Sequence, residues 1–218
     1  MKLKKLFVLV TLLVGVFFAN QAFSYTPLMY KIIIDTSGSV SQEDFQQANR
    51  SVAAFLEILY ERSQLHPGEA AEFISVSWFG SKNKYASTPF YNCSGINKVR
   101  ELQAILVNAR HPDFGSTAIY TAIARGTIEA IEFEKSIGKQ FPKFMIVMTD
   151  GEENDSPDEH KKLVRQIFPN RAIYLSVIGV GSGAKIDEFK DVAQDVRMIG
   201  NINEFYAALL ILSEAIGK

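Results

Sequence analysis

The stretch Lys-Ile-Ile-Ile-Asp-Thr-Ser-Gly-Ser, residues 31–39, is an apolar run that ends abruptly in an acid and three hydroxyl side chains. Three consecutive isoleucines predict a strand that is buried on both faces, as the central strand of a parallel sheet is. Ligands of open α/β sheets bind outside the carboxyl ends of the strands. The polar residues that follow the isoleucines are therefore candidates for a binding site.

Asp35, Ser37 and Ser39 alternate with other residues in this stretch. Side chains at i, i+2 and i+4 of an extended segment point to the same side, so one carboxylate and two hydroxyls are expected to converge there. All three are hard oxygen ligands, which suit Mg²⁺, Mn²⁺ or Ca²⁺ better than a thiophilic metal. The spacing predicts a cation site at the end of the strand.

Outward from this stretch, strand and helix patterns alternate to the end of the chain, which indicates a doubly wound sheet. Strands are expected over residues 29–35, 71–79, 84–91, 144–148, 172–180 and 197–199. Helices are expected after Ser41 and over residues 97–110, 118–137, a stretch ending near 168, 186–196 and 202–216. The expected fold class is α/β: a mostly parallel central sheet with one antiparallel edge strand, residues 84–91, and helices on both faces.

Residues 1–24 have the pattern of a signal peptide. Three lysines precede an apolar run over residues 6–19, and Ala22-Phe23-Ser24 fits a signal-peptidase site. The apolar run is shorter than the roughly 20 residues that span a bilayer. We expect export to the periplasm or the medium, cleavage before Tyr25, no membrane attachment of the mature form, and a single domain over residues 25–218.

Without residues 1–24, the chain has 20 basic and 24 acidic residues, a net charge of −4. This balance argues against a nucleic-acid partner, which needs a clustered basic face. Cys93 is the only cysteine, so the exported chain has no internal disulfide, and a small buried residue is the simplest interpretation of it. The sequence leaves the oligomeric state open.

Two further polar clusters lie at junctions between strands and helices: Thr117, within residues 115–123, and Asp150, within Thr-Asp-Gly-Glu at 149–152. Together with the Asp-x-Ser-x-Ser pattern at residues 35–39, they resemble the motifs of the von Willebrand factor type A (vWA) domain in order and separation. The succession of helices and strands agrees as well, so the resemblance covers essentially all of residues 25–218.

The resemblance implies a metal-ion-dependent adhesion site and no catalytic residues. In that family pattern, Ser37 and Ser39 bind the cation directly, and Thr117 does so in the ligand-competent arrangement. Asp35 and Asp150 act largely through metal-bound water. The cation, Mg²⁺ or else Mn²⁺ or Ca²⁺, then attracts a Glu or Asp carboxylate of a protein partner. The resemblance also allows a switch in which Thr117 gains or loses metal contact and the last helix shifts.

Each residue also has a structural interpretation when taken alone. Asp35 or Thr117 could cap a helix, and the serines and Asp150 could be turn residues. Partner specificity is expected in the loops 40–44, 112–116 and 151–160. The acidic residues of the last loop are interpreted as a solvated surface and not as ligands: Glu152, Glu153, Asp155, Asp158 and Glu159.

Other functional classes fit less well. A phosphatase of the haloacid dehalogenase type needs a second aspartate where Ser37 stands, since a serine cannot transfer that proton at neutral pH. An aspartic protease is all-β, which the helical periodicity excludes. A serine hydrolase lacks its G-x-S-x-G motif, and the three histidines, His66, His111 and His160, are interpreted as surface residues. A scaffold subunit of an extracytoplasmic complex, with a vestigial metal site, remains the main alternative.

Overall fold

The computed structural model describes residues 26–66, 71–112, 114–168 and 173–216. The predicted signal peptide lies outside these residues, so its cleavage stays a prediction. Within the described part of the chain, no helix combines the length and apolar character needed to cross a membrane.

The core is a seven-stranded sheet with the order β3-β2-β1-β5-β6-β7, in which β4 also pairs with β2. The β1–β2, β1–β5, β5–β6 and β6–β7 pairs are parallel, and β3 and β4 pair antiparallel with β2. The strands are β1 (Met29–Asp35), β2 (Phe73–Phe79), β3 (Tyr85–Ser87), β4 (Tyr91–Asn92), β5 (Lys143–Thr149), β6 (Ile173–Val180) and β7 (Asp195–Ile199). The predicted α/β class and the central position of residues 29–35 are confirmed.

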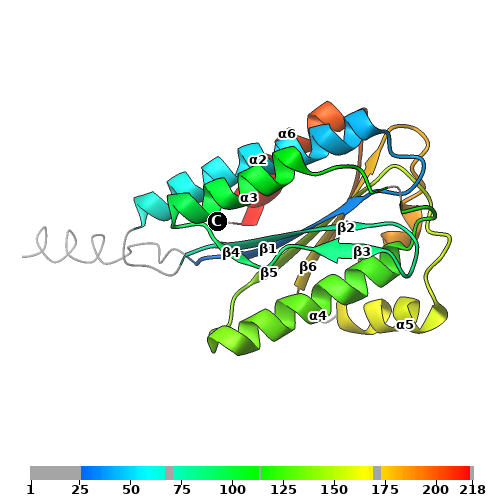
Figure 1. The fold of residues 1–218 in the computed structure, drawn as a ribbon. Coiled ribbons are helices and arrows are strands. Elements are labelled where there is room, and N and C mark those ends of the chain that lie inside the picture. Colours follow the sequence, from blue (N-terminus) through cyan, green and yellow to red (C-terminus); the bar gives the residue numbers. More distant parts are fainter. Residues whose placement is uncertain (1–25, 67–70, 113, 169–172, 217–218) are drawn as a thin grey trace, which may run out of the picture.

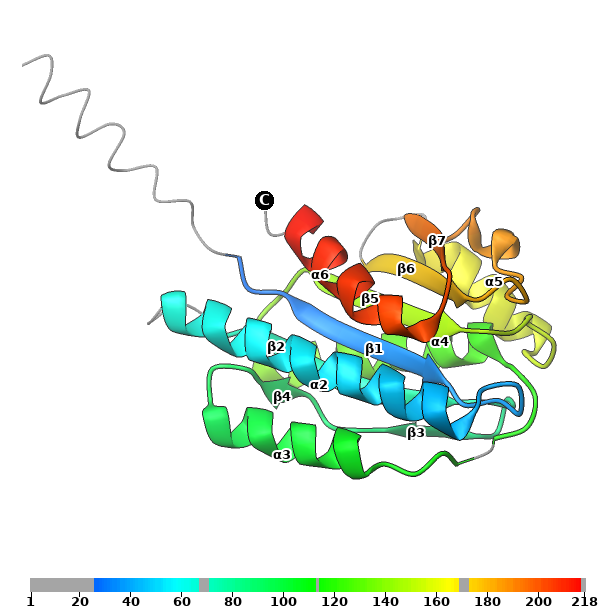
Figure 2. The same cartoon turned by 90° about the horizontal axis from the view of Figure 1, so that it is seen from above.

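Helices cover both faces of this sheet (Figure 1). One face carries α2 (Gln42–Leu65), α3 (Ile96–Asn108) and α6 (Phe205–Ile216), and the other carries α4 (Ile119–Ile137) and α5 (Asp158–Ile167). Two 3₁₀ turns, η2 (Asp187–Phe189) and η3 (Ile202–Glu204), flank β7. Seen from above, α2 and α6 run along β1 (Figure 2). In this arrangement, the carboxyl ends of the parallel strands are followed by loops.

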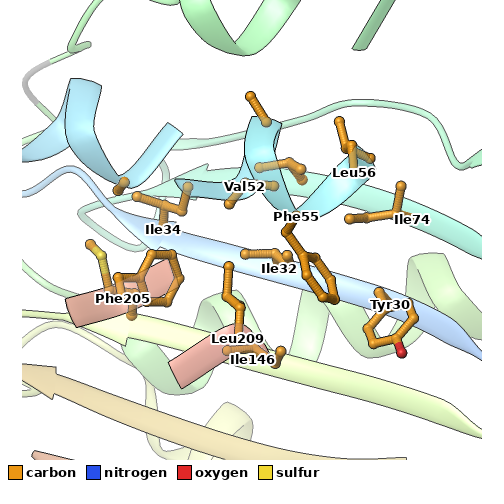
Figure 3. Close-up of a cluster of buried hydrophobic side chains, with 14 of the residues drawn as sticks. Tyr30, Ile32, Ile34, Val52, Phe55, Leu56, Ile74, Ile146, Phe205 and Leu209 are labelled. Carbon is orange, nitrogen blue, oxygen red and sulfur yellow. The ribbon is translucent and has the colours of Figure 1, made fainter. Parts of the chain in front are cut away.

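β1 has the buried pattern that its isoleucines predict, with all seven residues buried. Tyr30, Ile32 and Ile34 point toward α2 and α6, where Phe55 and Leu209 pack on them (Figure 3). Tyr30 and Phe55 meet edge-on, with ring centroids 5.4 Å apart. Burial of this set anchors the strand that ends at Asp35, because apolar area removed from water is the main stabilising term of a fold.

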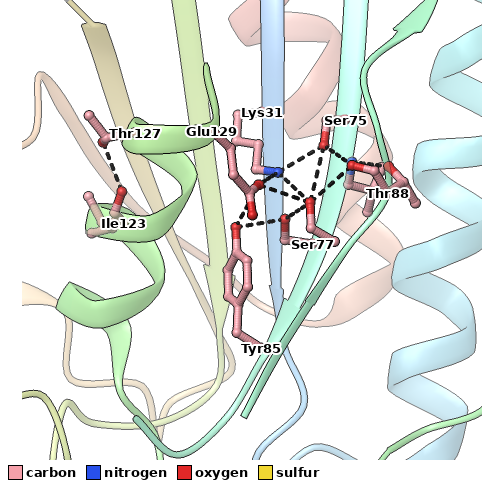
Figure 4. Close-up of polar contacts among 10 residues, drawn as sticks. Lys31, Ser75, Ser77, Tyr85, Thr88, Ile123, Thr127 and Glu129 are labelled. Atoms are coloured by element: carbon pink, nitrogen blue, oxygen red, sulfur yellow. Dashed lines mark hydrogen bonds and ion pairs between the residues drawn. The ribbon is translucent and has the colours of Figure 1, made fainter. Parts of the chain in front are cut away.

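Lys31 is the polar exception on the other face of β1, where it is 1% exposed. Its ammonium donates to Ser75 Oγ at 2.8 Å and to Ser87 Oγ at 2.9 Å, and it pairs with Glu129 of α4 (Figure 4). Burial lowers the pKa of Lys31 to about 8, although the Glu129 carboxylate opposes that shift. A buried cation of this kind needs such partners to be tolerated.

Two predicted elements differ from the structure. Residues 84–91 form β3 and β4 with a break between them, not one continuous edge strand. The helix predicted over residues 186–196 is wrong, because only η2 is helical and β7 begins at Asp195. Gln194 contributes to this: its backbone N–H donates to Leu175 O, and its side chain accepts from Leu175 N–H. These bonds to β6 hold the segment extended.

Candidate functional site

Asp35 ends β1 and is fully buried. Its Oδ1 accepts a 2.7 Å hydrogen bond from the Ser37 N–H, and its Oδ2 accepts a 2.6 Å bond from the Thr149 hydroxyl at the end of β5. Burial raises the pKa of Asp35 to about 6, and the bonds from Thr149 and Ser37 oppose that shift. The carboxylate is thus held between the ends of two adjacent strands.

The hydroxyls of Ser37 and Ser39 continue from Asp35 toward the surface. Ser37 Oγ and Ser39 Oγ lie 3.1 Å apart, and Ser39 Oγ donates to Asp150 Oδ1 at 2.8 Å. Asp150 is half-buried, and this burial raises the pKa of its carboxyl group. A continuous set of oxygens therefore joins the loop after β1 to the loop after β5.

Thr117 faces the same place from the segment before α4. A Cβ atom on Gly151 would lie 3.2 Å from Thr117 Oγ1 and 3.8 Å from Ser39 Oγ, so both hydroxyls lie close to Gly151. Thr117 does not cap α4: the N-cap is Ala118, which makes no side-chain cap bond. The structure brings together all five residues that the sequence singled out: Asp35, Ser37, Ser39, Thr117 and Asp150.

The loop after Asp150 fastens the Thr117 segment. Asn154 Oδ1 accepts from the Thr117 N–H at 3.0 Å, and the Asn154 N–H donates to the Thr117 carbonyl at 3.0 Å. These two bonds fix the Thr117 backbone against the loop that carries Asp150. Asn154 is a positioning residue that sequence reasoning missed, since nothing in the sequence pairs it with Thr117.

Glu153 of the same loop is buried, so the interpretation of Glu153 as a solvated acid is wrong. Its carboxylate accepts from the N–H groups of Asp155, Ser156 and Tyr120 and from the Ser156 hydroxyl. Ser156 Oγ in turn accepts from the Thr121 N–H at 3.0 Å. Tyr120 and Thr121 lie in the first turn of α4, whose N–H groups lack partners within the helix and favour an anion. Glu153 and Ser156 therefore cap α4 from a different loop.

Asp155 and Glu152, two other acids of this loop, differ in the contacts that they make. Asp155 Oδ2 accepts from the Ser116 hydroxyl and from the Lys82 N–H, which joins three loops at one carboxylate. Glu152 forms an exposed ion pair with Lys185, as a solvated surface residue can. His160 is not simply a surface residue, because its Nδ1 lies 2.9 Å from the buried Thr121 hydroxyl.

The residues at this site fit a hard cation. The donors that converge are hydroxyl and carboxylate oxygens, the ligands that Mg²⁺, Mn²⁺ and Ca²⁺ prefer. Among the described residues, no group of three or more histidines, cysteines, aspartates and glutamates is arranged to hold a metal ion. Cys93 is buried near β4, as expected from its residue type.

Comparisons with known proteins agree with the fold. Proximal thread matrix protein 1 of the mussel byssus superposes with a TM-score of 0.66 at 15% identity, over 86% of this chain and 47% of that one. A structure of the same byssus protein with a zinc-occupied MIDAS motif gives 0.66 at 17% identity, with the same coverage. The pilus adhesin SpaC of Lactobacillus rhamnosus GG gives 0.63 at 13% identity, over 89% of this chain and 31% of that one.

This chain spans less than half the length of each of these proteins, and the low identities make the likeness one of fold. No curated protein matches it. The sequence model of the von Willebrand factor type A domain matches residues 31–208, from β1 into α6. The chain therefore belongs to the von Willebrand factor type A domain family.

Proposed function

We propose that this protein is an exported, divalent-cation-dependent protein-binding module. Ser37, Ser39 and Thr117 would hold the cation through their hydroxyls, with Asp35 and Asp150 as the carboxylates of the site. A bound Mg²⁺ would supply a Lewis-acidic centre for a Glu or Asp carboxylate of a partner protein. Because the hydroxyl ligands are neutral, the cation would keep most of its positive charge.

The observation that carries the proposal is the chain of hydrogen bonds from Asp35 through the Ser37 N–H and the Ser37 and Ser39 hydroxyls to Asp150. Both carboxylates accept hydrogen bonds, but the charge of Asp150 still raises the pKa of Asp35, so two like charges drawn together at strand ends need a reason to be there. A cation is such a reason. The zinc-occupied MIDAS motif of the byssus protein, a structure of the same fold, also supports it.

Calorimetric titration of Mg²⁺ and Mn²⁺ into the purified protein tests the proposal, with acetate present as a model carboxylate. The Ser37→Ala, Ser39→Ala double variant should lose saturable binding. Ser136→Ala is a matched control, because the Ser136 hydroxyl donates to Phe133 O near the far end of α4, and this variant should bind as the wild type does.

Failure of the folded wild-type protein to bind either ion at millimolar concentration, with or without acetate, would contradict the proposal. The scaffold with a vestigial site would then be the better description. Equal binding by the double variant and the wild type would instead place the cation elsewhere in the protein.

A further inference from the structure

A cleft of about 200 Å³ opens directly beside the oxygens of the candidate site. Asp150 lines both the cleft and the site, so a ligand at one is adjacent to the other. The cleft lies between the loops that follow β1, β5, β6 and β7, and its lining residues are Val40, Asp44, Met148, Asp150, Val180, Gly181, Gly200, Asn201 and Ile202.

The lining of the cleft combines apolar and acidic residues. Val40, Met148 and Ile202 are buried side chains that contribute hydrocarbon to its lining. Asp44 and Asp150 supply carboxylates, and their charges lie near enough to act on one another. A long side chain with an aliphatic stem and a charged head matches this combination, because lysine and arginine bury their stems against apolar surface and keep the head group at polar atoms.

The charges in this region favour a cation. Asp44 and Asp150 line the cleft, and the partner's carboxylate, once it is bound at the cation, would add a negative charge nearby. The cleft therefore stays acidic in the bound state. Complementary charge across an interface selects partners and suppresses wrong ones.

We propose that this cleft receives a lysine or arginine side chain of the partner protein, next to the carboxylate that binds at the cation. This inference rests on the proposed function and narrows it, because it makes the recognised motif an acidic residue with a basic neighbour. Asp44 is the specificity-determining residue, since it lines the cleft and is not one of the residues that would hold the cation.

Asp44→Asn isolates the charge of that residue. Asp44 N–H donates to Ser41 Oγ, and Ser41 Oγ donates to Asp44 Oδ2, which together cap α2. Asparagine keeps the N–H and a side-chain oxygen, so the cap is expected to survive. Glu43→Gln is the matched control, because Glu43 is an exposed acid in the same turn of α2 and does not line the cleft.

The probes are short glycine-spaced peptides that contain one glutamate and, one to three residues away, arginine, leucine or a second glutamate. Their dissociation constants are measured by titration in saturating Mg²⁺ and again in EDTA. We expect the best arginine peptide to bind the wild-type protein about threefold to tenfold more tightly than the matching leucine peptide. Asp44→Asn should remove this preference, and Glu43→Gln should keep it.

The cleft proposal would be overturned if the leucine peptides bound as tightly as the arginine peptides or more tightly. It would also be overturned if Asp44→Asn kept the preference for arginine. In either case, Mg²⁺-dependent binding of the glutamate peptides would still uphold the proposed function. Absence of Mg²⁺-dependent binding by every peptide would overturn both. The two failures are therefore distinguishable in one set of titrations.

Discussion

The Thr149 hydroxyl donates a 2.6 Å hydrogen bond to Asp35 Oδ2 and thereby joins the ends of β5 and β1. The same hydroxyl oxygen accepts from the Gly151 N–H at 3.1 Å. One threonine therefore supports the buried acid of the candidate site and shapes the turn that carries Asp150. Its place directly before Asp150, at the end of a buried strand, is the sequence signal that could have identified it.

Thr149→Val keeps the shape of the side chain and removes both bonds. We expect the free energy of unfolding to fall by roughly 1 to 3 kcal/mol, because the buried Asp35 carboxylate loses a donor. Urea denaturation measures the change. Thr127→Val is the control: the Thr127 hydroxyl donates to Ile123 O within α4, and a smaller loss is expected there (Figure 4). Equal losses in the two variants would show that Thr149 has no special role at Asp35.

Asn154→Ala should weaken Mg²⁺ binding by about tenfold or more, because outer residues that orient ligands typically contribute that much to affinity. The physical reason is the loss of the Asn154 side-chain bond to the Thr117 N–H, which positions Thr117. Asn154→Asp keeps an acceptor there and should recover part of the affinity. Glu152→Gln changes an exposed acid of the same loop and should leave binding within about twofold. If Asn154→Ala and Glu152→Gln bind Mg²⁺ alike, Asn154 does not position the ligand.

Gly151→Ala tests whether the space beside Thr117 belongs to the site. The added methyl group would lie 3.2 Å from Thr117 Oγ1, which is a crowded contact, so we expect Mg²⁺ affinity to fall about tenfold. Gly183→Ala is a matched control, since its Cβ would come no closer than 3.9 Å to Asp150 O. Calorimetry with Mg²⁺ measures both. Unchanged affinity in Gly151→Ala would mean that Thr117 lies outside the set of ligands.

Lys31 gives a prediction about pH. Its pKa in the folded protein, about 8, is below the value of 10.5 for an unperturbed lysine. The unfolded chain therefore binds more protons between these two values, and stability must rise with pH across that window. We expect the wild type to gain roughly 1 to 3 kcal/mol relative to Lys31→Met as the pH increases from about 8 to 10.5.

Denaturant unfolding at several pH values measures this difference, and Lys143→Met is the control. Lys143 also pairs with a glutamate of α4, Glu134. The Lys143 side chain is 12% exposed, whereas the Lys31 side chain is 2% exposed. The control measures how far replacing another lysine that pairs with α4 changes stability over the same window. A flat difference between the wild type and Lys31→Met would mean that Lys31 titrates as an exposed lysine does.

Sequence reasoning recovered the parts of the molecule that depend on local pattern. The apolar runs at residues 32–34 and 144–148 are central strands, and the helix expected after Ser41 is α2, where the Ser41 hydroxyl accepts from the Asp44 N–H. The strand expected over residues 71–79 is β2, in which Val76 packs in the core with α2 while Ser77 faces the other way. Each of these follows from the period of an element or from a cap whose partner lies three residues away.

Longer-range polar contacts were beyond that reasoning. Lys31 sits in a strand whose pattern is otherwise apolar, and its partners Ser87 and Glu129 come from β3 and α4. The helix expected over residues 186–196 has the right periodicity, yet Gln194 and Asp195 bond to β6 instead. A hydrogen bond to a neighbouring strand outweighed a helical propensity that is worth only a few tenths of a kcal/mol per residue.

The sequence by itself determined the α/β class, because buried strands alternate with helices along it. It also singled out five candidate ligands, of which Thr117 and Asp150 were identified through the resemblance to the vWA motifs. Only the tertiary structure decided how those ligands are held. The Glu153 carboxylate caps α4, Asn154 fixes Thr117, and Thr149 supports Asp35 across two strands. The reason is that a hydrogen bond depends on which groups the fold brings within about 3 Å, and residues far apart in the chain carry no mark of that proximity.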